Sequence, residues 1–328
     1  MTMYNMVYDI TIGKYKLGMI AGVEIKRSVE LLSDTAIIHL PAIAYNKAFN
    51  STNNTLTITE KSIKAGDRVV IQLGYNDTLY TEFAGYLEHI ENENDQLHLY
   101  CEDAIYLYRK PLPNKEMINT NVKKIVSWVI EQLQLQHKLI CNYDVTYDKF
   151  VVADCSGYDV LKKIQEELKP NIYIKDNTLH IHPQYTEIFG EAKYDFAFNI
   201  EKSNLRYKDA TQRKLLVEIQ GKDKNGKIIK VEEGTTGGDR LTMNISGISS
   251  TASLKKIARE VLLNKGGYTG YEGTFTAWLI PYCDAGYKVS IIDNDYEYKN
   301  GCYYVTQVET KFDDNGAERT ITLGKKLE

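Results

Sequence analysis

The spacing of apolar residues changes character twice along this chain, and these changes limit the folds that it can adopt. Over residues 1–110 apolar and polar side chains alternate, as in Leu97, Leu99 and Cys101, which would share one face of a strand. On this basis strands are expected at 7–12, 23–27, 36–40, 67–73, 83–90 and 96–101. No amphipathic helix is expected before residue 120. The first region therefore predicts a small β-barrel or sandwich.

Helical spacing takes over in the second region, residues 111–200. Apolar residues recur every three or four positions over 121–136 and predict a helix. A second helix is expected over 157–169, because Ser156 and Asp159 form the S-x-x-D pattern of a helix start. Two short strands should follow, at 171–175 and 178–182. This region predicts a compact α+β domain.

Strands return in the third region, residues 201–328. They are expected at 215–222, 227–232, 272–279, 287–292, 303–312 and 318–324, with a turn at 224–226. One helix, at 252–263, interrupts them. The expected fold class is a β-rich α+β protein with three domains, at 1–110, 111–200 and 201–328. Residues 201–235 fit either β domain.

The two β regions contain similar segments. Residues 65–71 align with 285–291 at four identical positions of seven, and Arg68 aligned with Lys288 conserves the charge. The pattern G-x-x-V-x-I is also common wherever a strand leaves a turn, so coincidence is one interpretation. If the repeat is real, the two β regions are copies of one barrel on either side of the α+β domain.

Composition excludes several classes of protein. Tyrosine is frequent, with 25 Tyr against 8 Phe and 2 Trp, and this residue favours strands and half-exposed surfaces. A net charge of −4 excludes the broad basic surface of a non-specific nucleic-acid binder. Residues 51–100 carry three basic and eight acidic side chains, whereas residues 201–250 carry ten basic and seven acidic side chains. These stretches are either solvated faces or complementary patches that align copies of the chain.

The start of the chain and its cysteines indicate where it is made. The five cysteines are odd in number and show no C-x-x-C pair, so a disulfide framework and a structural zinc site are both unexpected. The first ten residues do not form a signal peptide, and the longest apolar stretch, 36–45, is too short to insert in a membrane. Synthesis and folding in a reducing cytoplasm are therefore expected.

Two groups of polar residues resemble metal sites, and each has a simpler interpretation. His180 and His182 alternate along one strand, but no third ligand lies nearby, and Leu179 and Ile181 fit the buried face of the same strand. The run 293–297 imitates a calcium loop, yet it lacks the glycine and the closing glutamate that such a loop needs. No metal site and no cofactor are expected.

The remaining patterns do not assemble an active site. The glycines at 267, 270 and 273 lead from a helix into a strand, the reverse of a phosphate loop. The serines of 246–253 are better explained as a helix cap. The acidic pairs 102–103 and 166–167 are sequence neighbours, and for 166–167, on the polar side of the expected helix, a solvated face is a better explanation than acid/base catalysis. The aromatic and basic residues of 106–110 are expected to form a strand end. No catalytic residue is predicted.

Three stretches resemble the tail hub family of phages and phage-like injection machines, which includes the late control protein D group and the hub part of type VI secretion spikes. The first is AGDRVVIQLGYNDTLYTEFAGYLEHIENENDQLHLYCEDAIYLYRK, residues 65–110. The second is CSGYDVLKKIQEELKPNIYIKDNTLHIHP, residues 155–183. The third runs from about residue 267 through IPYCDAGYKVSIIDNDY and GCYYVTQVETKF to ERTITLGKKL. Their order and spacing match the family over most of the chain.

The resemblance implies a structural protein without enzymatic activity. Two tube-like β-barrels would flank the α+β insert, and three chains would form a pseudo-six-fold ring between the hexameric tail tube and the central spike. The implied partners are further copies of the chain, a spike protein, and tail tube or baseplate ring proteins, without sequence-specific nucleic-acid binding or membrane insertion. The particle would be a virion tail baseplate or an equivalent assembly. Because the sequence ends at Glu328 without a spike-like barrel, the spike is expected on another polypeptide.

Two alternatives from other classes stay open at this point. A tail-associated cell-wall hydrolase would carry a similar front part, but it should add a lytic domain with a recognisable nucleophile or metal site. A carbohydrate-binding tail adhesin would explain the tyrosines, but it gives no reason for two similar β regions around a helical insert.

Overall fold

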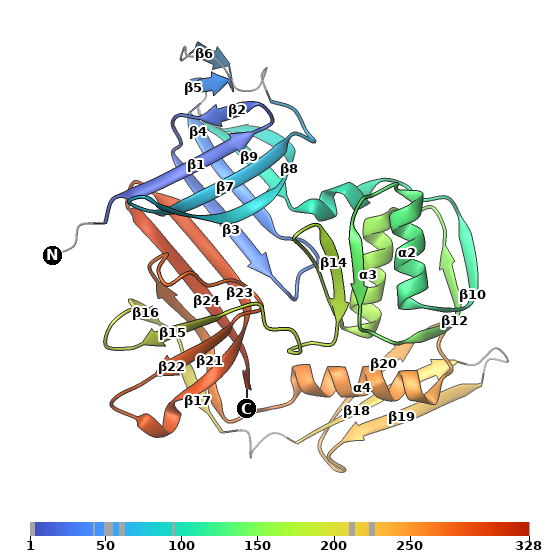
Figure 1. Cartoon of the computed structure of the whole chain (residues 1–328). Helices are drawn as coiled ribbons and strands as arrows, with labels where there is room; N and C mark the ends of the chain where they lie inside the picture. The colour runs from blue at the N-terminus through green and yellow to red at the C-terminus, as the bar shows by residue number, and fades with distance from the viewer. Residues whose placement is uncertain are drawn as a thin grey trace. The chain divides into compact units, whose positions relative to one another are not determined.

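A computed structural model describes residues 4–41, 43–48, 55–58, 63–93, 96–209, 214–222 and 227–327 (Figure 1). The chain forms two compact units, and each consists of segments that are separate in the sequence. Unit 1 comprises Met1–Tyr106, Phe189–Leu205 and Gly273–Gly324. Unit 2 comprises Leu107–Ile188, Arg206–Glu272 and Lys325–Glu328.

Unit 1 contains two β modules with the same strand order. The first module consists of β1 (Met6–Ile12), β3 (Gly22–Ser28), β4 (Thr35–Pro41), β7 (Arg68–Tyr75), β8 (Thr78–Glu93) and β9 (Gln96–Glu102). The second module consists of β15 (Glu191–Asp195), β16 (Lys202–Ser203), β21 (Gly270–Ala277), β22 (Lys288–Ile292), β23 (Gly301–Asp313) and β24 (Gly316–Leu327).

The strands of the two modules are also arranged alike. Across the sheet the first module runs β3-β4-β9-β8-β7-β1, and the second runs β16-β21-β24-β23-β22-β15, so that strands of equal rank in the sequence occupy equal places. One difference is direction, because β1 pairs antiparallel with β7 whereas β15 pairs parallel with β22. The modules join where β23 pairs with β3. The predicted similarity of the two β regions therefore extends to their topology.

The aligned segments 65–71 and 285–291 make the same hydrogen bonds. The N–H of Gly66 donates to Leu87 at 2.7 Å, and the N–H of Gly286 donates to Val305 at 2.8 Å. Both glycines have a positive φ, of 89° and 83°, which a glycine adopts without strain. In return, the N–H groups of Leu87 and Val305 donate to the residue after each glycine, both at 2.8 Å. The resemblance of these segments is structural as well as sequential.

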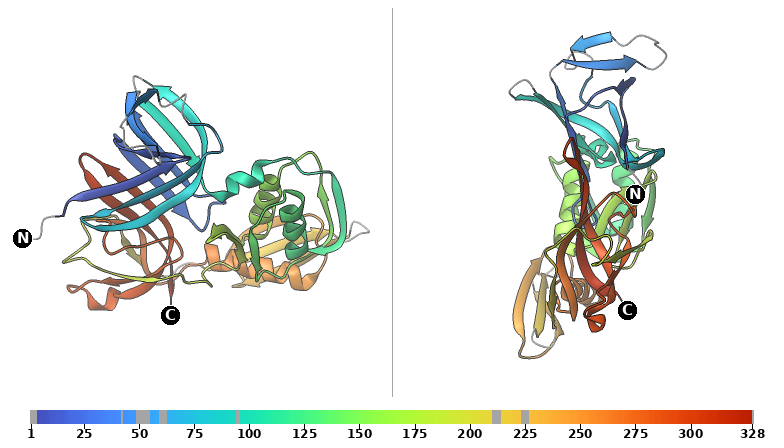
Figure 2. Two further views of the ribbon diagram at one scale, coloured as in Figure 1. Left: turned by 45° about the horizontal axis from the view of Figure 1, so that its top comes forward. Right: turned by 90° about the vertical axis from the view of Figure 1, so that its left-hand side faces the viewer.

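The first module encloses a core of aliphatic side chains contributed by alternate residues of each strand. In β4 this alternation buries Ala36, Ile38 and Leu40, and in β7 it buries Val69, Ile71 and Leu73. The blue-to-cyan strands of this module form a curved sheet (Figure 2). The buried side chains belong to one hydrophobic cluster. Three short strands, β2 (Tyr15–Leu17), β5 (Ile43–Ala48) and β6 (Thr55–Ile58), extend the sheet beyond β1. The described strands form an open path without a closed barrel, and the expected pair of tube-like barrels stays a prediction.

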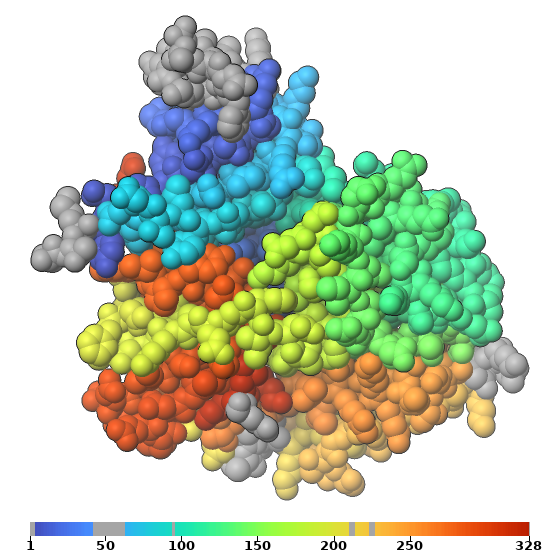
Figure 3. Space-filling view, viewed as in Figure 1, coloured from blue at the N-terminus to red at the C-terminus, as the bar shows by residue number. Residues whose placement is uncertain are grey.

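The segment Phe189–Leu205, which contains β15 and β16, crosses the surface of unit 1 as a yellow-green to yellow band between orange and red residues of the second module (Figure 3). Its one fully buried aromatic side chain is Tyr194, which packs against Phe275 with ring centroids 4.8 Å apart. Residues 189–200 of this segment, with β15, were expected in the α+β insert, although β15 pairs with β22 of the second module. Strand β16 was expected in the 201–328 region, and it pairs with β21 of the second module.

Unit 2 combines helices with three small sheets. Its helices are α2 (Val122–Gln132), α3 (Gly157–Leu168) and α4 (Thr251–Lys265). Its sheets are β10 (Lys115–Asn121) with β12 (Thr146–Val152); β11 (Lys138–Cys141) with β14 (Thr178–His182) and β13 (Asn171–Lys175); and β18 (Leu215–Lys222) with β19 (Ile228–Gly234) and β20 (Asp239–Ile245). Helix α4 packs on β18 and β19. The strand β17 (Arg206–Lys208) pairs with the start of β21.

All three predicted helices are present. Helix α3 begins with the expected capping box, in which Ser156 and Asp159 bond each other's backbone N–H groups. Helix α2 ends four residues before the predicted end at 136. The expected strand end at 106–110 is wrong, because residues 104–109 form a 3-10 helix, η1 (Ala104–Arg109). The turn predicted at 224–226 lies outside the described residues, although the strands on either side pair antiparallel as expected.

The grouping of the chain differs from three consecutive ranges. Residues 206–272, expected within a second β domain, lie in unit 2, because α4, β18, β19 and β20 form a layer of their own. Within unit 2 this layer contacts the 107–188 segment: Ser253 hydrogen-bonds Thr146, and Glu260 accepts from the N–H of Gln184 at 3.3 Å. The second β module is thus interrupted by an insertion between β16 and β21.

Candidate functional site

A cluster of charged side chains is buried in unit 1 where the two β modules meet. Arg27 of β3, Glu82 of β8 and Arg319 of β24 are 5%, 1% and 0% exposed. Each oxygen of the Glu82 carboxylate accepts from one of the two arginines. Tyr282 and Asp284 complete this charge cluster, because Nη1 of Arg27 lies 2.8 Å from the Tyr282 hydroxyl and 3.1 Å from Oδ1 of Asp284. The cluster therefore links both modules.

A β-bulge directs Glu82 into this position. Ile71 of β7 is opposite Phe83, but Gln72 is opposite Thr81, so Glu82 is the extra residue of β8. A bulge lets two consecutive side chains point to the same side of a strand. Glu82 and Phe83 are accordingly both buried. Without the bulge the alternation of β8 would expose Glu82.

The surroundings of the charge cluster keep the Arg27 guanidinium charged. Burial by itself lowers the pKa of Arg27, but Asp284, Glu82 and Tyr282 more than offset this effect, and the net pKa lies well above its ordinary value. Nη1 of Arg319 donates to the carbonyl oxygens of Leu279 and Pro281, at 2.6 and 3.2 Å. Loss of one partner from a buried ion pair of this kind strongly destabilises the fold, because the other charge then stays buried alone.

Sequence reasoning did not single out the charge cluster, although a signal for it is present. Val23 and Ile25 alternate inward along β3, and Arg27 occupies the next inward position. In β24 the inward residues Ile321 and Leu323 are preceded by Arg319 in the same alternation. A charged residue at a position that periodicity assigns to the core requires a buried partner. That partner, Glu82, could not be identified because the bulge removes it from the alternation.

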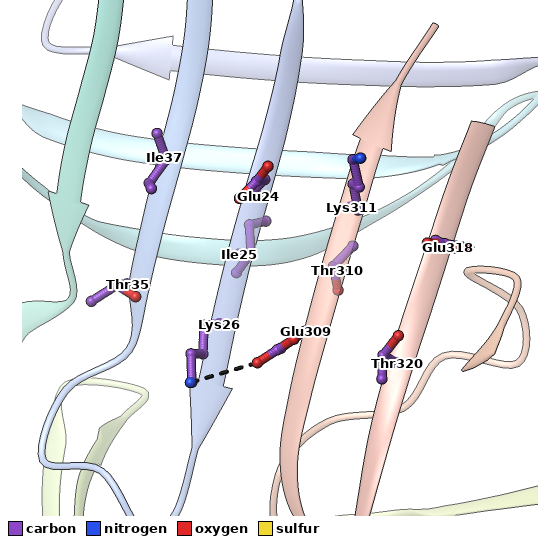
Figure 4. A pocket seen from close by; sticks show the side chains of 10 residues that line it. All are labelled: Glu24, Ile25, Lys26, Thr35, Ile37, Glu309, Thr310, Lys311, Glu318 and Thr320. Carbon is purple, nitrogen blue, oxygen red and sulfur yellow. Dashed lines mark ion pairs between the residues drawn. The ribbon is translucent and has the colours of Figure 1, made fainter. Parts of the chain in front are cut away.

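The opposite face of the joined sheet is polar. Strands β4, β3, β23 and β24 line a shallow pocket of about 390 Å³ on this face (Figure 4). Across the β3–β23 junction Lys26 pairs with Glu309 at 3.5 Å, and Glu24 is directly opposite Lys311. Glu318 of β24 lines the same pocket. This polar sheet face presents alternating charges rather than a catalytic arrangement.

Two histidines extend the polar sheet face over the first module. His39 of β4 and His98 of β9 are directly opposite, with their Nδ1 atoms 2.7 Å apart. Nε2 of His39 lies 3.8 Å from a carboxylate oxygen of Glu24. Burial lowers the pKa of His39, Glu24 raises it, and His98 and Lys311 lower it further, with a net decrease. His39 is therefore favoured in its neutral state near pH 7.

The structure places the predicted candidate residues in structural roles. His182 is 1% exposed; its Nε2 contacts the Tyr173 hydroxyl, and its Nδ1 lies 2.8 Å from the carbonyl oxygen of Pro183. His180 stacks on Tyr173 with ring centroids 5.3 Å apart. In the run 293–297, the carboxylate of Asp293 accepts from the N–H groups of Asp295 and Tyr296. These residues shape a strand and a turn.

The remaining candidates also hold local structure together. Ser250 caps α4 by accepting from the N–H of Ser253. Asp103 caps η1 by accepting from the N–H of Ile105, and its burial raises its pKa well above the ordinary value. Glu167 accepts from the Tyr147 hydroxyl at 3.2 Å. Arg109, in the aromatic and basic run, stacks over Tyr158 at 4.3 Å.

The described part of the chain contains neither a metal-binding cluster nor a helix that could span a membrane. No three or more His, Cys, Asp or Glu side chains of the described residues come together to hold a metal ion. None of the helices within these residues is long and apolar enough to cross a membrane. The absence of catalytic, cofactor and metal residues stays a prediction.

Comparison with known proteins identifies the class of fold. No protein-family model matches the chain, and no curated protein matches its sequence. Solved structures do match over nearly the whole chain, and they include phage tail proteins and a type VI secretion component. The β-rich architecture described above is thus a fold of phage tail proteins.

The individual matches are distant in sequence. The 43 kDa tail protein of prophage MuSo2 from Shewanella oneidensis matches with a TM-score of 0.67 and 14% identity over 98% of both chains. The tail protein from Neisseria meningitidis MC58 matches with a TM-score of 0.68 and 12% identity over 98% of this chain and 97% of that one. The E. coli c3393 protein matches with a TM-score of 0.62 and 11% identity over 97% of this chain and 79% of that one. It is a type VI secretion component with structural similarity to the T4 tail proteins gp27 and gp5.

Proposed function

We propose that this chain is a structural hub protein of a phage tail baseplate or a phage-like injection machine. Three copies would form a pseudo-six-fold ring that joins the hexameric tail tube to the central spike. The observation that carries the proposal is the repeated strand order of unit 1, because a chain with two similar modules supplies six modules from three copies. The fold shared with phage tail proteins supports the same role.

We propose that each module is a tube-like β-barrel element and that unit 2 contains the inserted α+β part. In terms of the expected domains, the first barrel spans 1–110, the insert 111–200 and the second barrel 201–328, which unit 2 interrupts at 206–272. The proposed partners are other copies of the chain, a spike protein, and tail tube or baseplate ring proteins. Assembly into the particle would follow synthesis in a bacterial cytoplasm.

The proposal includes the absence of enzymatic activity. Incubation of the purified chain with peptidoglycan, casein and nucleotides should release no more product than a buffer blank. Reproducible turnover that a single substitution abolishes would contradict it. Nothing in the described residues favours the hydrolase or the adhesin over the hub.

Co-purification tests the proposed partners. When the tagged chain is isolated from particles of its producing strain, a trimeric spike protein and a tube-type ring protein should co-purify, with three copies of this chain per particle end. Recovery of the chain without either partner, from particles that contain both, would contradict the hub function.

A further inference from the structure

The junction between the two modules of one chain is a strand pairing with a definite register. Residues 307–313 of β23 pair antiparallel with residues 22–28 of β3. The preceding residues of β23, 301–304, pair with β22. The second module therefore offers one edge of β23 beyond the end of β22, and the first module occupies that edge with β3.

Each module also contains a strand that corresponds to the one that the other module contributes to this junction. By rank in the sheet, β8 of the first module corresponds to β23, and β16 of the second corresponds to β3. Residues 78–86 of β8 pair with β7, and β8 continues beyond the end of β7 to Glu93. Over this extension β9 is the one strand that pairs with it among the described residues. Likewise β16 pairs with β21 and, in the described chain, with no second strand.

We propose that the β16 edge of one chain pairs with the β8 extension, residues 88–93, of a second copy and so repeats the β3–β23 junction between chains. The inference rests on the proposed ring and names the surfaces that close it. One chain offers both edges, so the contact is head-to-tail, and such contacts close into a ring when the rotation between copies fits.

The backbone of β16 is oriented for this pairing. The N–H of Asn204 donates to the carbonyl oxygen of Thr274 in β21 at 2.9 Å. Successive N–H groups of a strand point to opposite edges. Ser203 is directly opposite Phe275, and the bond from Asn204 to Thr274 marks these two as a non-hydrogen-bonded pair. The N–H of Ser203 therefore points away from β21, toward the edge that a second copy would occupy. An edge with outward N–H groups is a ready template for another strand.

Charge complementarity supports the same pairing. Lys202 of β16 lies on the polar sheet face, because its Nζ is 3.2 Å from Glu318, which lines the pocket on that face. Glu91 of β8 lies on this face too, because it is directly opposite His98. Glu93 shares its side by alternation. The proposed junction thus brings Lys202 next to acidic residues, as Glu24 and Lys311 are opposite within the chain.

Cysteine cross-linking tests this proximity. We would combine Lys202→Cys with Glu91→Cys in one variant and with Glu93→Cys in another, and treat each with a short bis-maleimide. Covalent dimers and trimers are expected for at least one of the two, with no larger species. The matched control combines Lys202→Cys with Glu166→Cys, on the polar side of α3, and should give no ladder.

Native cysteines set the background of this experiment. Burial raises the pKa of the Cys101 and Cys283 thiols to about 12, which leaves them unreactive toward maleimide near pH 7. The other three cysteines are partly exposed, so the untreated and treated wild-type chain serve as references.

A backbone variant provides an independent measurement. Ser203→Pro removes the outward N–H and leaves the hydrogen bonds to β21 in place, so the oligomer should dissociate at concentrations at least tenfold higher than for wild type. Ser203→Ala keeps the N–H and should assemble as wild type does. Equal circular dichroism spectra would show that both variants are folded.

The outcomes separate this proposal from the ring itself. A wild-type trimer that neither cross-links at these positions nor responds to Ser203→Pro would contradict the β16–β8 junction and leave the hub function standing. A wild-type chain that stays monomeric at the highest soluble concentration would contradict the ring, and the junction with it.

Discussion

Three side chains, Arg27, Glu82 and Arg319, carry the strongest constraint at the scale of single residues. Each comes from a different strand, and together they bury three full charges in a sheet that is otherwise lined with aliphatic groups. Such groups are stable in the interior only when every charge has its partner. The charge cluster therefore specifies how β3, β8 and β24 are positioned.

Replacing Glu82 tests this interpretation. Glu82→Gln keeps the shape of the side chain but leaves two buried guanidinium groups without an anion between them, so unfolding should need about 3–5 kcal/mol less free energy than in wild type. Urea unfolding measures the difference. Glu88→Gln, on the same strand but half-exposed, should change the unfolding free energy by less than about 1 kcal/mol. A Glu82→Gln chain as stable as wild type would show that the cluster is not structural.

The buried histidine of β14 predicts a pH dependence. Burial, the largest effect, lowers the pKa of His182, and this outweighs the raising effects of Pro183 and Glu187. The unfolded chain therefore binds a proton at a higher pH than the folded chain does. Stability contributed by neutral His182 is present above about pH 6.5 and is lost as the pH falls toward the lowered folded value.

A comparison of slopes isolates this contribution from other titrating groups. Between pH 7 and pH 5 the unfolding free energy of His182→Gln should fall less than that of wild type, although the variant is less stable at pH 7. Equal pH slopes for the two proteins would contradict the assignment of His182 as a buried, neutral side chain.

At the scale of elements, the sequence predicted best where local chemistry determines the structure. The start of α3 was predicted correctly because Ser156 and Asp159 satisfy its first N–H groups themselves. Strands such as β4 and β7 were predicted because one face of each is buried. The strands that were missed are short or lie at sheet edges for the most part; they are β2, β5, β6, β10, β11, β12, β15, β16, β17 and β20. The bulge at Glu82 depends on pairing with β7, which periodicity cannot reveal.

The paired glycines of the two modules allow an element-scale prediction. Gly66→Ala introduces strain from a positive φ, but the new Cβ meets no atom closer than 3.7 Å, so a loss of about 1 kcal/mol is expected. Gly286→Ala adds a Cβ that lies 2.6 Å from the Phe189 ring at the same φ. Gly286→Ala should therefore lose more stability than Gly66→Ala does, as measured by thermal and urea unfolding. The reverse order would mean that the two turns are not equivalent.

At the scale of the whole molecule, the two units could not be derived from the sequence. Residues 107–188 and 206–272 are separated by β15 and β16, yet they pack together, so three consecutive domains were the simplest expectation. The repeated module was detectable only at 65–71 and 285–291, because elsewhere the two copies share strand order without sharing residues. Topology, rather than sequence identity, supports the proposed ring.

Charge reversal at the proposed junction belongs to this scale. Lys202→Glu places like charges across the contact and should weaken each junction by ~1 kcal/mol or less, since the residues are exposed. The midpoint concentration of assembly should rise accordingly, and Glu91→Lys or Glu93→Lys in the same chain should restore it. Sedimentation velocity at several concentrations measures both effects. Weakening without rescue by either partner would argue that Lys202 acts through Glu318 within its own chain.

The central claim is that three chains close into a ring of six similar β modules. Electron microscopy of the assembled chain, with the copy number established by native mass spectrometry, tests it most directly. We expect particles of three copies with three-fold symmetry, in which strands 68–75 and 288–292 occupy equivalent places around a pseudo-six-fold axis. A dimer that persists at high concentration, or a ring in which these strands are not equivalent, would contradict it.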